Sequence, residues 1–146
     1  MTKKLARGTL ALLLLFVVPL TSLASVDGAK GRAEQILNAL LERGWTVNET
    51  YDSGLLAPRG VALIKVNLIA GRHYKIVAGG CENAYNVGIA LYDENEHLID
   101  RDTTGNGPIA VVDVTPKWTG LFYVGVKMIN CSSHGAHYVV QYAWEE

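Results

Sequence analysis

The stretch Tyr92–Asp102, YDENEHLIDRD, carries the densest set of cation-binding groups in the chain. It holds five acidic side chains and one Asn within eleven residues. Calcium accepts about six to eight oxygen ligands, which separate loops can supply. Asp93, Asn95, Asp100 and Asp102 are therefore candidate calcium ligands, and the last two point the same way if they lie on one strand.

The same stretch also fits the polar tip of a β-hairpin. A calcium-binding EF-hand loop starting at Asp93 fails, because His97, Leu98 and Thr104 occupy its fifth, sixth and twelfth positions. Charged residues at hairpin tips and sheet edges commonly maintain solubility and block edge pairing. We favour the hairpin and retain calcium as the alternative; no other cofactor is expected.

The N-terminus has the pattern of a secretory signal peptide. Basic residues in the first seven positions precede the apolar run Leu10–Leu20, and the small residues of Ser22–Ala24 suit signal peptidase. The run is shorter than the roughly 20 residues that a membrane-spanning helix needs. We expect residues 1–24 to be removed and the mature protein, without a membrane span, to be periplasmic or secreted.

Charge excludes one class of partner. Cleavage removes three of the 13 Lys and Arg residues and none of the 14 Asp and Glu residues, leaving a net charge of −4. Nucleic-acid binding requires basic patches, so we expect no nucleic-acid partner. A mature chain of 122 residues is large enough for one domain with a real core.

Cys81 and Cys131 are the only two cysteines. An even pair in an oxidising compartment indicates one disulfide, closing a loop of about 51 residues. His134 and His137 follow Cys131 closely. Because the chain has no second cysteine pair with zinc-ligand spacing, we do not expect a zinc site.

Hydrolytic chemistry would need a serine or another nucleophile beside a base. The candidates are Ser53, Ser132 and Ser133 with His73, His97, His134 and His137. None lies in a recognisable nucleophile turn, and the chain has no phosphate-binding loop. We therefore expect a non-enzyme, with a small Ser/His hydrolase as an alternative.

Hydrophobic periodicity divides the mature chain into a helix at residues 25–44 and a β domain at residues 45–146. The helical stripe is formed by Ala33, Ile36, Leu37, Leu40 and Leu41, and Gly44 ends it. From Trp45 onward apolar residues alternate in short runs separated by turn residues. The pattern predicts an all-β, antiparallel jelly-roll β-sandwich of about eight strands, preceded by one amphipathic helix.

The strands are expected to bury one face each. The expected inward sets are Ala62/Ile64/Val66/Leu68, Tyr74/Ile76/Ala78, Val87/Ile89/Leu91, Phe122/Val124/Val126/Met128 and Tyr138/Val140/Tyr142/Trp144. Apolar residues also occur on outward positions, as at Val61, Leu63 and Ile69. We therefore expect the N-terminal helix to cover part of one sheet.

Aromatic side chains could supply a stacking platform for sugars. Most are explained by the core, because Tyr138, Tyr142 and Trp144 share the parity of Val140. Tyr51, Tyr85 and Trp118 lie near strand ends and are the surface candidates for ligand binding.

The segments AGRHYKIVAGGC, NVGIALYDENEHLI, PIAVVDVTPKWTGLFYVGV and YVVQYA together resemble the bacterial pre-peptidase C-terminal domain. The resemblance covers roughly residues 55–143 and uses the turn at Gly71–Tyr74, the strand end at Leu91–Asp93 and the strand entry at Thr119–Tyr123. It implies an exported jelly-roll β-sandwich of the kind often appended to secreted hydrolases.

Members of this family often carry an acidic pair associated with calcium on the strand entering the Leu91–Asp93 position. Here those positions are Asn86 and Gly88, so the resemblance does not imply a calcium site there. It implies a role in binding, inhibition or envelope structure.

We therefore expect an exported, non-catalytic binding or accessory module that recognises a protein or a glycan in the periplasm or outside the cell. A calcium-dependent β-sandwich module is the alternative from a different class.

Overall fold

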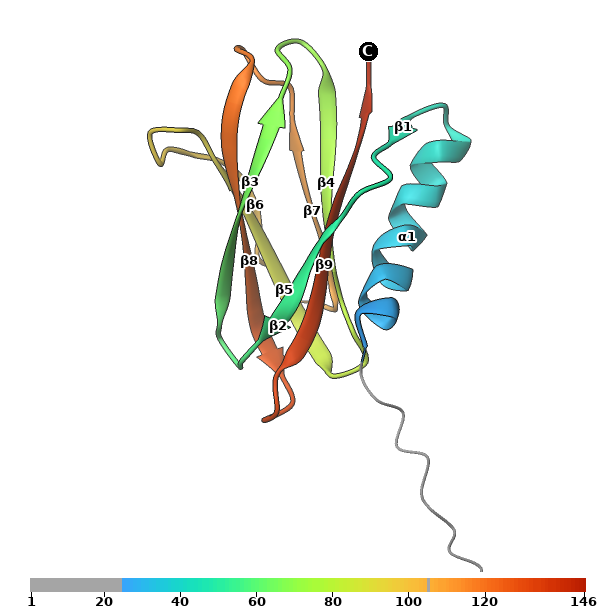
Figure 1. The fold of residues 1–146 in the computed structure, drawn as a ribbon, viewed down its shortest axis with the longest axis vertical. Helices are drawn as coiled ribbons and strands as arrows, with labels where there is room; N and C mark the ends of the chain where they lie inside the picture. The colour runs from blue at the N-terminus through green and yellow to red at the C-terminus, as the bar shows by residue number, and fades with distance from the viewer. Residues whose placement is uncertain (1–24, 105) are drawn as a thin grey trace, which may run out of the picture.

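A computed structural model describes residues 25–104 and 106–146, so the signal peptide predicted for residues 1–24 lies outside the described residues. One helix precedes nine strands (Figure 1). These elements are α1 Val26–Glu42, β1 Thr46–Val47, β2 Asp52–Leu56, β3 Val61–Leu68, β4 His73–Gly80, β5 Ala84–Tyr92, β6 Leu98–Asp102, β7 Ile109–Val114, β8 Gly120–Cys131 and β9 Ala136–Glu145. In the two described ranges, no helix is long and apolar enough to cross a membrane.

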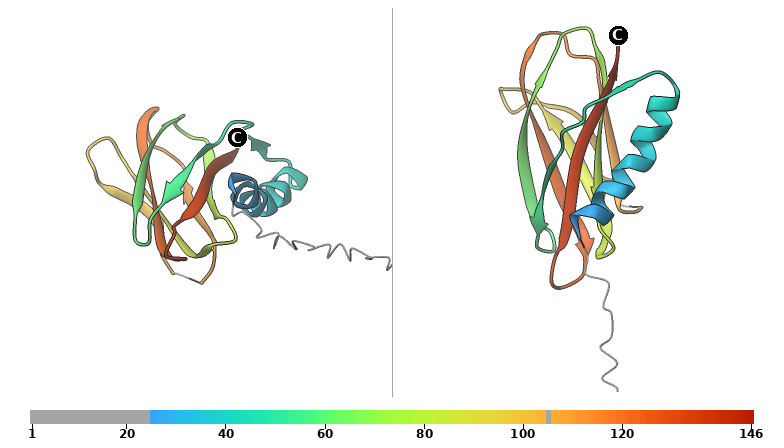
Figure 2. Two further views of the ribbon diagram at one scale, coloured as in Figure 1. Left: turned by 60° about the horizontal axis from the view of Figure 1, so that its bottom comes forward. Right: turned by 45° about the vertical axis from the view of Figure 1, so that its right-hand side comes forward.

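The strands form two antiparallel sheets packed face to face (Figure 2). The helix-side sheet has the order β1-β9-β4-β7, with β2 also paired to β9, and the open sheet has the order β3-β8-β5-β6. Without the two-residue β1, the orders 2-9-4-7 and 3-8-5-6 are those of a jelly roll. The predicted fold class is confirmed, with nine strands because β1 pairs with the end of β9.

The core lies between the sheets and contains most of the predicted inward residues; Ala62, Tyr142 and Trp144 are only partly buried and pack against it. Ile76, Val124 and Val126 are fully buried, and the five predicted inward sets occupy the facing sides of the two sheets. Strand alternation identified this core because the side-chain period of a strand is two.

The helix begins at a capped N-terminus, where the Ser25 side chain accepts a hydrogen bond from the Gly28 backbone N–H. It packs on the outer face of β4 and β9. Its buried stripe consists of Ala29, Ala33, Leu37 and Leu40. The alanines fit because Gly79 on β4 has no side chain; a Cβ there would clash with the Ala29 carbonyl oxygen.

The position of the helix corrects two expectations. Leu41, which the periodicity placed in the buried stripe, is 56% exposed. The helix covers one sheet as predicted, but not the sheet whose outward apolar residues prompted the prediction. Val61 and Leu63 lie on the open sheet and remain 61% and 64% exposed. The helix covers the other sheet because Gly79 on β4 lets α1 approach that sheet closely.

Candidate functional site

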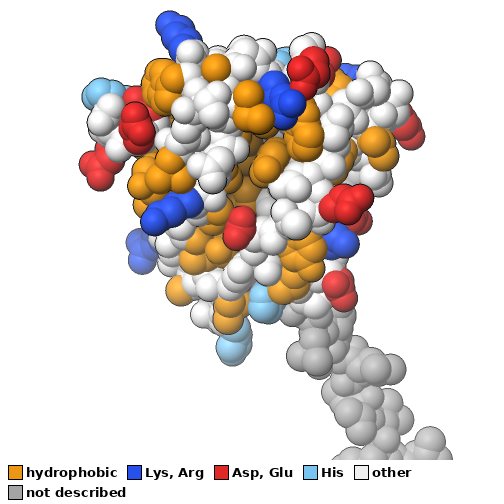
Figure 3. All heavy atoms as spheres, turned by 45° about the horizontal axis from the view of Figure 1, so that its top comes forward, with side chains coloured by type: hydrophobic (Ala, Val, Ile, Leu, Met, Phe, Trp, Pro, Cys, Tyr) orange, Lys and Arg blue, Asp and Glu red, His pale blue; other side chains and the backbone are white. Residues whose placement is uncertain are grey.

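The outer face of the open sheet contains a hollow of about 760 Å³. Its lining is supplied by β3, β8 and β5 of this sheet and by the segments on either side of β6. Its middle and one of its walls are formed by Val61, Leu63, Ala90, Tyr92, Tyr123 and Gly125. A space-filling view shows hydrophobic side chains reaching the surface of the molecule in several groups, with charged side chains among and around them (Figure 3).

Small residues create the hollow. Gly125 on β8 lies opposite Leu63 on β3 and opposite Ala90 on β5. The side chains in the middle of the sheet, at Gly125 and Ala90, therefore project very little from its surface. Tyr92 and Tyr123 are paired across β5 and β8 and form one wall. A Cβ placed on Gly125 would lie 3.6 Å from Tyr92 Cε2, an ordinary contact. The floor is therefore low because glycine is present, and not because a neighbour excludes a side chain.

Charged groups stand at the margins of the hollow. Glu94 and Glu96, from the turn between β5 and β6, line it, as does Lys127 on β8. The hollow is thus an apolar floor with aromatic and charged borders, an arrangement typical of binding surfaces.

The acidic stretch that suggested calcium closes one edge of the sandwich. Asp100 Oδ2 accepts a hydrogen bond of 2.8 Å from the Asp113 backbone N–H, and Asp102 Oδ2 accepts one of 3.0 Å from the Val111 N–H. Val111 and Asp113 are alternate residues of β7, the last strand of the helix-side sheet. The two carboxylates therefore bridge the sheets and occupy donors that would otherwise be open to edge pairing.

Asp93 has a second local role. It is buried, and its carboxylate accepts hydrogen bonds from the backbone N–H groups of Asn95 and His97 and contacts the His97 ring. These N–H groups, His97 foremost, lower the pKa of Asp93 below its usual value. The predicted hairpin is confirmed by the pairing of β5 with β6. Among residues 25–104 and 106–146, no three His, Cys, Asp or Glu side chains are grouped to hold a metal ion.

Replacing Asp102 with Ala is expected to destabilise the protein by about 1–2 kcal/mol, because the Val111 N–H loses its acceptor. The loss should be the same with EDTA and with excess calcium, measured by chemical unfolding. Glu94→Ala, in the same stretch, is the control and should change stability little. A loss that appears only with calcium would instead support a cation site at Asp93, Asn95, Asp100 and Asp102.

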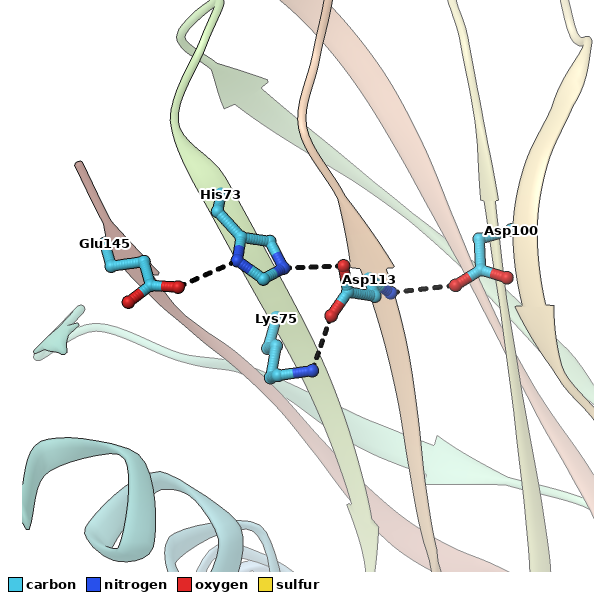
Figure 4. Close-up of polar contacts among 5 residues, drawn as sticks. All are labelled: His73, Lys75, Asp100, Asp113 and Glu145. Carbon is cyan, nitrogen blue, oxygen red and sulfur yellow. Dashed lines mark hydrogen bonds and ion pairs between the residues drawn. The ribbon is translucent and has the colours of Figure 1, made fainter. Parts of the chain in front are cut away.

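A separate polar cluster lies at one end of the helix-side sheet (Figure 4). His73 on β4 is held between two carboxylates: Nδ1 lies 2.9 Å from Glu145 Oε1, and Nε2 lies 2.6 Å from Asp113 Oδ1. Lys75 Nζ contacts the other Asp113 oxygen at 2.5 Å. Both ring nitrogens of His73 are occupied by acids, so this histidine has no nitrogen left to act as a base toward a serine.

The surroundings favour the charged forms of this cluster. Partial burial lowers the pKa of His73, but its hydrogen bonds to Glu145 and Asp113 outweigh burial and raise the pKa above the ordinary value. Burial raises the pKa of Asp113, but hydrogen bonds from Lys75 and His73 bring the net value below the ordinary one. The ring of Trp45 packs edge-on against His73, with centroids 4.9 Å apart. The cluster therefore ties the sheet to the segment that follows the helix.

The free energy of unfolding is expected to depend on the protonation of His73. A raised folded-state pKa stabilises the protein fully below the unfolded value of about 6.5, and this stabilisation is lost as pH rises through the folded pKa. Since the groups are partly exposed, the effect should be below about 1 kcal/mol. Wild type should exceed His73→Gln in stability most at about pH 5–6 and least at about pH 9. A difference that grows with pH would contradict this assignment.

The two cysteines lie at the ends of strands: Cys81 follows β4, and Cys131 is the last residue of β8. Both are buried with free thiols in this structure. Ala84, which donates its N–H to the Cys81 carbonyl oxygen at 2.9 Å, pairs with Cys131 across β5 and β8. Burial raises the pKa of the Cys131 thiol, and the nearby Cys81 adds to this shift. The disulfide stays a prediction, and the fold places Cys81 and Cys131 beside the same residue, Ala84.

The three surface aromatics are not brought together. Tyr51 precedes β2 and lies under the Lys30 ammonium, 5.3 Å from the ring centroid. Tyr85 is at the start of β5, while Trp118 precedes β8 and stacks on Phe122. Because β5 and β8 are antiparallel, the last two lie at opposite ends of the open sheet. They are 41%, 54% and 40% exposed, but they form no shared platform.

One of the serine–histidine candidates is in contact. Ser133 Oγ lies 3.4 Å from His134 Nδ1, and both residues are exposed in the loop between β8 and β9. Within the described part of the chain, the hydrogen bonds link no serine, histidine and carboxylate into one set.

Comparison with known proteins places the fold. No protein-family model matches the sequence, and no curated protein matches it either. Among solved structures, the pre-peptidase C-terminal domain of a collagenase from Bacillus anthracis matches with a TM-score of 0.50 and 15% identity, over 64% of this chain and 87% of that chain. The chain has the fold of a pre-peptidase C-terminal domain. The resemblance seen in the sequence is thereby confirmed for the fold alone.

A second solved structure matches at a similar level. It is PliG from Aeromonas hydrophila, a periplasmic inhibitor of g-type lysozyme, with a TM-score of 0.49 and 12% identity over 70% of this chain and 90% of that chain.

The hollow was missed by sequence reasoning, although part of its signal was visible. Val61 and Leu63 were recognisable as outward apolar residues. Ala90 and Gly125 have the same outward parity on their own strands, but only the pairing of β3, β8 and β5 places them beside Leu63. A hollow made by small residues on three strands requires the register, which a single sequence does not contain.

Proposed function

We propose that the protein is exported and acts as a non-catalytic recognition module that binds another protein through the outer face of the open sheet. The observation that carries the proposal is the apolar hollow beside Val61 and Leu63. The equivalent face of the other sheet is covered by α1, whereas this one is left to solvent. An exposed apolar surface bordered by polar groups is typical of protein interaction sites.

Export is supported by the signal-peptide pattern of residues 1–24 and by a cysteine pair suited to an oxidising compartment. A protein partner fits the hollow better than a polar ligand, because aliphatic side chains and small residues supply its floor and the edge near β3. Tyrosine is also a common anchor at protein interfaces.

A glycan is the second candidate. Tyr92 and Tyr123 stand side by side at the wall of the hollow, and the carboxylates of Glu94 and Glu96 could accept hydrogen bonds from sugar hydroxyls. The same variants therefore have to be tested against both classes of partner.

The test compares two exposed leucines on the two sheets. Leu63→Asp lies in the hollow, and Leu55→Asp, on β2, is the control with a similar exposed fraction of 60%. The immobilised processed protein should enrich a defined partner from an exported-protein fraction, and Leu63→Asp should lose it while Leu55→Asp retains it. A glycan array probed with the same proteins covers the second candidate. Equal binding by both variants would reject the hollow as the recognition site.

A further inference from the structure

The outer face of the open sheet carries a prominence and a depression side by side. Val61 and Leu63 project from β3, the edge strand. Across the sheet from Leu63, the same row continues with Gly125 and Ala90, which leave the floor low. A face that holds both a knob and a matching hole can fit a second copy of itself when the copies are related by a two-fold axis.

The charges on this face are divided in the same direction. Lys65 lies two residues beyond Leu63 on β3, paired with Tyr123, and it is exposed. Glu94 and Glu96 lie across the hollow, in the turn between β5 and β6. Lys65 therefore lies on the β3 side of the hollow, and the Glu94 and Glu96 carboxylates lie across from it.

Two further cations share the face. Lys127 lies opposite Val61 and Gly88, at the far end of the hollow from the tyrosine wall. Arg101 on β6 lies opposite Ala90, in the row of Leu63. Neither stands between Lys65 and the acidic turn.

From this layout we infer that the partner of the open face is a second copy of this chain, an inference that rests on the proposed function. A two-fold axis parallel to the strands brings β3 of each copy over β5 and β6 of the other. Leu63 then enters the hollow of the second copy, beside Ala90 and the aliphatic part of Arg101. Lys65 approaches Glu94 and Glu96 of the second copy. Opposite charges in register favour this arrangement over others.

Charge reversal tests the pairing by complementation. Sedimentation equilibrium of the processed wild-type protein should show a reversible dimer. Lys65→Glu alone places acids against acids, and the double variant Glu94→Lys/Glu96→Lys alone places lysines against lysines. Each should raise the dimer dissociation constant about tenfold or more. Mixed in equal amounts, the two variants form a heterodimer in which both contacts are again opposite in charge, so association should return to near the wild-type level.

Lys117→Glu, a reversal away from the hollow, is the control and should leave the dimer intact. A wild type that remains monomeric, or variants whose mixture associates no better than each alone, would overturn the inference. If the protein is monomeric but Leu63→Asp still abolishes capture of a different protein, the recognition function stands and only the second copy is rejected. If Leu63→Asp changes neither self-association nor capture, both are rejected.

Discussion

Oxidation of the processed protein is expected to join Cys81 and Cys131 and to raise the free energy of unfolding. Closing a loop of about 51 residues removes roughly 4 kcal/mol of chain entropy from the unfolded state. Cys81 follows β4 and Cys131 ends β8. Both are buried and lie beside Ala84, whose N–H donates to the Cys81 carbonyl oxygen and which pairs with Cys131. Chemical unfolding of oxidised and reduced protein measures the difference.

The matched control is Cys131→Ser, which should make unfolding insensitive to reductant. Thiol counting in denaturant supplies the independent reading: no free thiol is expected in the oxidised wild type. Two free thiols in protein purified under oxidising conditions, with no effect of reductant on stability, would contradict the disulfide.

Replacing Leu37 with Ala is expected to cost about 2–5 kcal/mol, the range for a buried leucine whose removal leaves a cavity. Leu37 is 1% exposed in the layer between α1 and the helix-side sheet. Leu41→Ala is the internal control, because the same chemical change one turn along the helix affects a side chain that is 56% exposed. That variant should lose less than about 0.5 kcal/mol.

Urea unfolding followed by circular dichroism checks this pair. Similar losses in the two variants would mean that the helix does not pack on β4 and β9 through this stripe. If the helix detaches as a unit in Leu37→Ala, the sheets should remain folded. The change in tyrosine and tryptophan fluorescence would then occur at a higher urea concentration than the loss of the helical circular dichroism signal.

The fold was predictable because each strand of a sandwich buries one face, so that apolar and polar residues alternate along its sequence. In β8, for example, Phe122, Val124 and Val126 alternate with residues that face outward, and all three are buried. The helix was predictable for a similar reason, since Ala33, Leu37 and Leu40 recur at helical spacing and all three are buried.

What could not be predicted is which distant residues meet. Asp100 and Asp102 were assigned by type to a cation site or to a solvated hairpin, and the structure gives them a third role as acceptors for β7. That role depends on β6 and β7 lying at the same edge of two different sheets. Sequence proximity does not encode that relation.

The same limit applies to the helix and to His73. Small residues at Ala29, Ala33 and Gly79 decide which sheet the helix covers, but they are unremarkable by composition. His73 and Lys75 were visible on one side of a strand, whereas their acidic partners Asp113 and Glu145 come from two other strands. Register, more than residue type, determines these contacts.

The most direct test of the recognition surface is site-specific photo-crosslinking in the exporting cell. A photoreactive residue at position 63 samples the hollow, and one at position 55 samples an equally exposed point on the other sheet. We expect a discrete protein adduct from position 63 and none from position 55, with an adduct of twice the chain mass if the partner is a second copy. If position 63 gives no adduct, or both positions give the same adducts, the hollow is not the recognition surface.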